Sequence, residues 1–129
     1  GKRLERRLAL HLETVSHLMT FTGHGDGYVA VNGRRYEQPL VVSADSVRTD
    51  WPATGFARLE PAHFDYFLEL RPEVLLFGCG ASQQFAHPAL WQNLHRYGIG
   101  IEFMDTPAAC RTYNILVAEG RKVVAAVLL

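Results

Sequence analysis

Hydrophobic and polar positions alternate in short runs through the first half of the chain, with turn signals between the runs. The clearest pair, Tyr28–Val31 and residues 34–37, is joined by Asn32 and Gly33. An Asn-Gly pair supplies the two positive φ angles of a type I′ turn, so these runs are predicted to form a β-hairpin. The other elements of this half are a turn or loop at residues 23–27 and two short strands at residues 40–43 and 47–51. The first half is therefore predicted to be an antiparallel meander.

The second half has longer apolar runs that alternate with segments of helical period. The run at residues 74–77, Val-Leu-Leu-Phe, is continuous, as in a strand that is buried on both faces. Prolines and glycines mark where the elements begin and end. The predicted helices are residues 61–71, 88–97 and 105–119, and the predicted strands are residues 74–77, 99–104 and 122–129. Strands that alternate with helices through short loops predict βαβ units, so we expect an α/β domain in which the meander is followed by βαβαβ.

The N-terminal segment carries a helical stripe beside several basic residues. Apolar side chains recur at i, i+4, i+8 and i+11, namely at Leu4, Leu8, Leu12 and Val15. A basic amphipathic helix of this kind can lie on a membrane surface or on a partner protein. A short docking helix or a terminal arm explains the same stripe, and residues 8–12 also alternate as a strand would. We treat residues 1–20 as an N-terminal arm or helix and residues 21–129 as a single α/β domain.

Length, composition and charge narrow the class of protein. A chain of 129 residues with 48% hydrophobic and 20% charged residues can bury one core without disulfide support. Lys plus Arg and Asp plus Glu number 13 each, so the chain lacks the basic excess that general nucleic-acid binding requires. We therefore predict no nucleic-acid partner.

Cysteine usage and the absence of targeting patterns indicate in which cellular compartment we expect the protein, namely a reducing one. Cys79 and Cys110 stand in no CxxC or Cys/His cluster, which is typical of a protein in a reducing environment. No apolar run reaches the roughly 18 residues of a membrane span, and no signal-peptide pattern is visible. We expect a cytoplasmic bacterial protein without a membrane span, and any peripheral contact with a membrane would fall to the N-terminal arm.

Two strand ends are predicted to meet at one edge of the sheet, where open α/β sheets bind their ligands. Gly78, Cys79 and Gly80 follow the first of these strands, and Asp105 and Thr106 follow the second. The glycines let the chain turn sharply and let a ligand approach backbone N–H groups. The Gly-x-Gly lacks the third glycine of a dinucleotide site and the Lys-Ser/Thr of a P-loop, so we assign no nucleotide cofactor. A purely structural turn is the alternative explanation.

The third predicted helix adds two polar side chains to this edge. Asn114 lies in the middle of the helix, where asparagine is mildly unfavourable and usually has a hydrogen-bonding reason. Arg111 lies close enough to Thr106 along the helix for its long side chain to fold back toward the helix start. Asp105, Arg111 and Asn114 could form a network that binds a small acidic ligand or one that holds the loops together. The candidate site is thus a cleft between residues 78–82 and 105–111.

Recognisable catalytic and metal-binding patterns are missing from the sequence. The six histidines show no metal-ligand spacing, and no GxSxG motif is present. Cys79 and His87 lie eight positions apart, but a small apolar filler in a turn is the simpler interpretation of the cysteine. We therefore assign no catalytic residue, no metal and no cofactor.

Four segments of the second half together resemble a known family of small α/β domains. They are residues 75–80, 98–102, 104–116 and 119–121, and the run from Asp105 to Arg121 is the most specific of them. The family includes the mitochondrial NADH dehydrogenase (complex I) assembly factor 3 and an adipogenesis-associated domain protein. The resemblance implies a three-layer fold with a mixed central sheet and an additional β layer.

The resemblance also implies a function. It implies a non-enzymatic interaction or assembly factor that has a protein partner, with a role in respiratory-complex (complex I) biogenesis. The alternative is a small anionic-ligand binding protein, or an unrecognised enzyme, that uses the cleft between residues 78–82 and 105–111.

Overall fold

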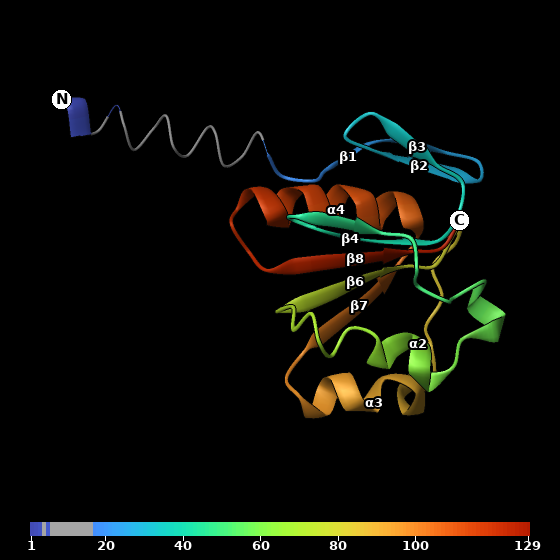
Figure 1. The fold of residues 1–129 in the computed structure, drawn as a ribbon. Coiled ribbons are helices and arrows are strands. Elements are labelled where there is room, and N and C mark those ends of the chain that lie inside the picture. The colour runs from blue at the N-terminus through green and yellow to red at the C-terminus, as the bar shows by residue number, and fades with distance from the viewer. Residues whose placement is uncertain (4, 6–16) are drawn as a thin grey trace.

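The computed structural model describes residues 1–3, 5 and 17–129, and from residue 17 onward it has two β-sheets and four helical segments (Figure 1). The strands are β1 (Phe21–Gly25), β2 (Tyr28–Val31), β3 (Arg34–Tyr36), β4 (Leu40–Ser43), β5 (Ser46–Arg48), β6 (Val74–Gly78), β7 (Gly100–Met104) and β8 (Val123–Val127). The helices are the 3-10 turn η1 (Phe56–Arg58), α2 (Pro61–Asp65), α3 (Pro88–Arg96) and α4 (Thr106–Ala118). The predicted N-terminal stripe of Leu4, Leu8, Leu12 and Val15 lies outside the described residues.

The Asn-Gly hairpin is confirmed, but the loop predicted before it is wrong in part. Asn32 and Gly33 have φ angles of 48° and 84°, as a type I′ turn requires. The first three residues of the predicted 23–27 loop instead belong to β1, which pairs antiparallel with β2. Glycine at position 25 serves packing there, because a Cβ atom would collide with the ring of Tyr28 on the neighbouring strand. Only Asp26 and Gly27 form the turn.

The predicted meander is antiparallel, but its strands are divided between two sheets. The order in the small sheet is β1-β2-β3, and the order in the central sheet is β5-β4-β8-β6-β7. The last strand, β8, lies in the middle of the central sheet, parallel to β6 and antiparallel to β4. The central sheet is therefore mixed, as the family resemblance implied.

Each face of the central sheet is covered by a different layer (Figure 1). On one face α2 and α3 enclose an aromatic core around Phe64, Phe67 and Phe77. On the other face α4 and the small sheet enclose an aliphatic core that includes Tyr113. The three-layer α/β domain with an additional β layer is confirmed.

Three predicted elements are too long. The strand predicted at residues 122–129 is β8, which covers Val123–Val127. Helix α2 ends at Asp65 rather than at residue 71, and residues 66–70 continue as hydrogen-bonded turns. Arg71 has a φ angle of 46°, so the chain has left the helical region before Pro72. Strand β5 ends at Arg48 because the chain turns away to bury Trp51, whose indole N–H donates to the carbonyl oxygen of His63 over 2.9 Å.

Candidate functional site

The two predicted strand ends do meet at one edge of the central sheet. Strands β6 and β7 are parallel, with Gly78 opposite Met104. Beyond them, the backbone N–H of Cys79 donates to the carbonyl oxygen of Met104 and that of Thr106 to the carbonyl oxygen of Gly80, both over 2.8 Å. The turn after β6 and the start of α4 are therefore one hydrogen-bonded unit.

Thr106 connects three segments at this edge. Its side chain is buried, with 5% of the residue exposed. The hydroxyl donates to the carbonyl oxygen of Leu128 over 2.6 Å and accepts from the backbone N–H of Gly80 over 2.9 Å. A hydroxyl has one proton to donate, so that of Thr106 is committed to the fold.

The close approach of Thr106 explains the first glycine of the Gly-x-Gly. A Cβ atom on Gly78 would lie 2.9 Å from the Thr106 hydroxyl oxygen and 3.1 Å from Val127 Cγ1. The second glycine, Gly80, has a φ angle of 98°, which a larger residue adopts only with strain. Both glycines therefore have a structural reason that involves no ligand.

Asp105 and Cys79 also bond within the protein. The Asp105 carboxylate accepts from the backbone N–H of Ala108 over 2.8 Å and so caps α4. The Cys79 thiol donates to the carbonyl oxygen of Gln84 over 3.2 Å, and burial raises the pKa of this thiol, so it stays neutral. His87 caps α3 through a bond from Ala89 N–H to its Nδ1 (3.1 Å).

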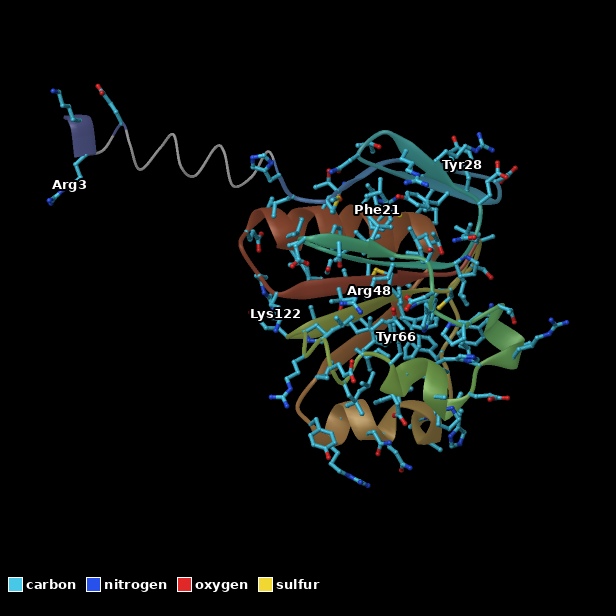
Figure 2. The ribbon with its side chains drawn as sticks, viewed as in Figure 1. Arg3, Phe21, Tyr28, Arg48, Tyr66 and Lys122 are labelled. Carbon is cyan, nitrogen blue, oxygen red and sulfur yellow. The ribbon has the colours of Figure 1, made fainter. Side chains whose placement is uncertain are left out.

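Asn114 holds the small sheet to α4. Its Oδ1 accepts from the backbone N–H of Phe21 over 2.9 Å, and its Nδ2 donates to the carbonyl oxygen of Phe21 over 2.8 Å. The side-chain amide thus continues the strand pairing at the edge of β1. The neighbouring Tyr113 hydroxyl donates to the carbonyl oxygen of Met19 over 2.7 Å. Figure 2 shows Phe21 between the small sheet and α4.

The predicted network of Asp105, Arg111 and Asn114 does not form among these side chains. Asp105 bonds to its own helix, Asn114 bonds to β1, and Arg111 is exposed on α4. The mid-helix asparagine does have the hydrogen-bonding reason that its position suggested, but its partner is a strand that the local sequence could not identify.

A hollow of about 300 Å³ lies at this edge of the sheet. Its lining residues are His24, Gly25, Asp26, Gly27, Tyr28, Gly80, Ala81, Thr106, Pro107 and Leu129. Of the candidate site residues, Gly80 and Thr106 line it, whereas Gly78 and Cys79 are buried and the side chains of Asp105, Arg111 and Asn114 lie elsewhere. The tip of the β1–β2 hairpin supplies the other wall. No local pattern indicated that this tip would reach the edge, so sequence reasoning missed His24 and its neighbours.

A second hollow, of about 840 Å³, lies at the opposite ends of β6 and β7. It is lined by Leu68, Glu69, Arg71, Pro72, Glu73, Tyr97, Gly98 and Ile99. Within residues 1–3, 5 and 17–129, no three His, Cys, Asp or Glu side chains gather as a metal site. In the same part of the chain, no helix has the length and apolar character that a membrane span needs.

Fold and sequence together identify the family. Residues 21–128 match the family described as "Protein of unknown function (DUF498/DUF598)", and the chain belongs to it. A crystal structure of a Bordetella parapertussis protein is 42% identical, covers 86% of this chain and 95% of its own, and superposes with a TM-score of 0.81.

Two similar proteins carry descriptive names. Assembly factor 3 of the NADH dehydrogenase [ubiquinone] 1 alpha subcomplex from Bos taurus is 31% identical over 126 residues, 96% of this chain and 63% of the bovine protein. The "13 kDa major membrane protein" of Francisella tularensis is 28% identical over 117 residues, 90% of this chain and 95% of its own. The resemblance inferred from residues 75–121 is thus confirmed.

Proposed function

We propose that this chain is a protein-interaction module that acts in the assembly of a multi-subunit complex, namely in respiratory-complex (complex I) biogenesis. The observation that carries this proposal is the similarity to the bovine assembly factor across 96% of the chain. That match includes the small sheet and α4 as well as the central sheet. Because the chain spans 63% of the bovine protein, the matched part is the domain and not the whole relative.

The distribution of polar and apolar groups supports an interaction role. At the predicted cleft, Asp105, Thr106 and Asn114 use their side chains in bonds within the protein. Large apolar side chains are instead exposed elsewhere: Phe85 is 73% exposed and Tyr97 is 70% exposed. Exposed aromatic residues of this kind are enriched where proteins bind one another.

The proposed place of action is the bacterial cytoplasm, at the surface of a membrane complex. Cys79 and Cys110 are both free thiols and buried, as in proteins of a reducing compartment. The Francisella relative carries a membrane protein's name, which supports a peripheral contact with a membrane or with a complex inside it.

Affinity capture of the tagged chain from its native cell tests the proposal. Subunits of respiratory complex I are expected to be enriched over a capture with an untagged chain. A Phe85→Ser, Tyr97→Ser double variant serves as the comparison, since it removes exposed aromatic side chains that pack little inside the fold. Recovery of the same proteins from tagged and untagged cells would refute the assembly role.

Binding of a small anionic ligand, or an unrecognised enzyme activity, is the second candidate function. It is favoured by the hollow of about 300 Å³ beside Gly80 and Thr106, where His24 supplies a titratable side chain. Inorganic phosphate titrated into the isotope-labelled chain should then shift the amide resonances of Gly80 and Ala81, and His24→Ala should weaken that response. Shifts spread evenly over the protein would count against a site in this hollow.

A further inference from the structure

Strand β7 ends the central sheet on one side and leaves part of its backbone without a neighbouring strand. The N–H of Gly100 donates to the carbonyl oxygen of Glu73 over 3.1 Å, and the carbonyl oxygen of Met104 accepts from Cys79 N–H over 2.8 Å. Backbone groups of successive residues in a strand point to opposite sides. Ile101 and Phe103 therefore direct their N–H and C=O groups away from β6, toward the open edge.

One of these four outward groups has a partner within the protein. The side-chain amide of Gln83 donates to the carbonyl oxygen of Phe103 over 3.0 Å. That bond confirms the outward direction of the Phe103 backbone. The N–H of Phe103 and both backbone groups of Ile101 have no hydrogen-bond partner among the described residues.

The other edge strands of the described chain have fewer free backbone groups for pairing. Strands β3 and β5 have three residues each. Strand β1 has five residues, but the Asn114 amide already bonds to both backbone groups of Phe21. Proteins commonly protect edge strands by shortness or by covering groups. Strand β7 has five residues, and among the described residues the Gln83 amide is the one side chain that bonds to its outward backbone groups.

The two faces beside the β7 edge differ in chemistry. Ile101 and Phe103 face the aromatic core, next to Trp91 and to Phe85, whose ring lies 6.3 Å from that of Phe103. Glu102 faces the opposite side, where α4 packs over β6 and β8, and its side chain is exposed. A strand added here would meet apolar groups on one face and a carboxylate on the other.

Glu102 also disfavours a second copy of this chain as the strand that pairs with the β7 edge. Two copies paired antiparallel through Ile101 and Phe103 would place Glu102 opposite Glu102 on the same face. Residues directly opposite in such a pair lie about 4.5–5.5 Å apart, and like charges there are destabilising. A partner with a basic residue at that position would gain an attraction in place of the repulsion.

We propose that the free edge of β7 binds an extended segment of a partner protein that alternates aliphatic residues with lysine or arginine. The segment adds a sixth strand to the five-stranded central sheet. Its backbone bonds to both backbone groups of Ile101 and to the N–H of Phe103, its aliphatic side chains lie beside Phe85, and a basic side chain meets Glu102. This inference rests on the proposed interaction role and gives that role a surface.

Hydrogen exchange with synthetic peptides tests the edge directly. The probe is a short peptide that alternates valine and lysine, added to the isotope-labelled full chain. Exchange of the Ile101 and Phe103 amides should slow, while that of Glu102, whose N–H faces β6, should change little. A peptide that alternates valine and glutamate, and a valine–lysine peptide with a central proline, should give no protection.

Two variants keep the result falsifiable. Glu102→Lys should weaken binding of the valine–lysine peptide roughly tenfold, whereas Glu119→Lys, the same charge change at an exposed position beyond α4, should not. Ile101→Pro removes an outward N–H without removing a bond to β6, so it should abolish protection of Phe103 in a folded chain. The proposal is overturned if protection is absent, if both charged peptides bind equally, or if the chain dimerises through β7.

The experiments can refute the assembly role and the β7 binding surface independently of each other. Capture of complex I subunits together with no peptide protection at β7 would leave the assembly role standing and reject this surface. Peptide binding at β7 without those subunits in the capture would keep the surface and reject complex I as the partner.

Discussion

The two faces of the central sheet are stabilised in different ways. The face under α2 and α3 is filled by aromatic rings: Phe64 stacks on Phe77 at 5.3 Å, and Trp51 meets Phe77 edge-on at 5.7 Å. The face under α4 is aliphatic and is crossed by directed hydrogen bonds from Thr106, Tyr113 and Asn114. Buried volume therefore dominates on the first face, and specific polar contacts determine which segments meet on the second.

Replacing the central ring of the aromatic face should have the largest effect on stability. Phe77→Ala removes a side chain that contacts rings from four different segments, and it leaves a cavity. The free energy of unfolding should fall by about 3–5 kcal/mol. Urea denaturation, monitored by tryptophan fluorescence, measures this free energy. Phe85→Ala, at an exposed position, is the control. Equal losses for the two variants would contradict the importance of the aromatic core.

Removing the Thr106 hydroxyl should have a clear effect of similar or smaller size. Thr106→Val keeps the shape and leaves Gly80 N–H and the carbonyl oxygen of Leu128 without their partner. Each unsatisfied buried group costs about 1–3 kcal/mol, so the free energy of unfolding should fall by at least about 2 kcal/mol, as measured by urea denaturation. Thr54→Val, at an exposed position, is the matched control and should change stability little.

Cutting the Asn114 bonds should release the small sheet without unfolding the rest. Asn114→Ala removes both bonds to Phe21, and the loss should be about 2 kcal/mol because each hydrogen bond contributes about 1 kcal/mol net. Amide exchange should speed up in β1 and remain slow in β6 and β8. Gln92→Ala, at an exposed position on α3, controls for loss of a polar side chain on a helix. Uniform acceleration across both sheets would show that the two sheets unfold together.

The smallest effect near neutral pH is expected at Cys110 on the α4 face, where the stability should depend on pH only under alkaline conditions. Burial raises the pKa of the Cys110 thiol from 9.0 to about 12. The unfolded chain therefore loses this proton before the folded chain does, and the stabilisation is complete below pH 9 and declines as the pH rises toward 12. Cys110→Ala should reduce the slope of unfolding free energy against pH by up to about 1.4 kcal/mol per unit in that window. Equal slopes of unfolding free energy against pH for the original chain and Cys110→Ala would contradict this prediction.

Local chemistry made several turns and helix ends predictable. Gly98 and Gly120 have φ angles of 76° and 80° and end helices where the sequence indicated. Asp105 caps α4, and Asn32-Gly33 forms the expected hairpin turn. The end of α2 was wrong because buried Phe64 and Phe67 follow an apolar spacing that fits a helix as well as a series of tight turns.

The candidate site was predictable only in part. Gly80 and Thr106 do lie at a hollow where two strand ends meet, because parallel strands bring their ends to one edge. The partners of the polar groups were not predictable: Thr106 bonds to Leu128, 22 residues away, and Asn114 bonds to Phe21, 93 residues away. A mid-helix asparagine signals that a bond exists, but the bond's other end depends on how the whole chain folds.

By itself, the sequence determined most of the turns and of the helix and strand boundaries, the α/β class and the family. These follow from backbone angles and side-chain periods that neighbouring residues set among themselves. Only the tertiary structure decided that β8 is a central strand, that the hairpin tip reaches the edge beside Gly80, and that β7 is left open. Those features depend on which distant segments bury one another, and no local pattern records that choice.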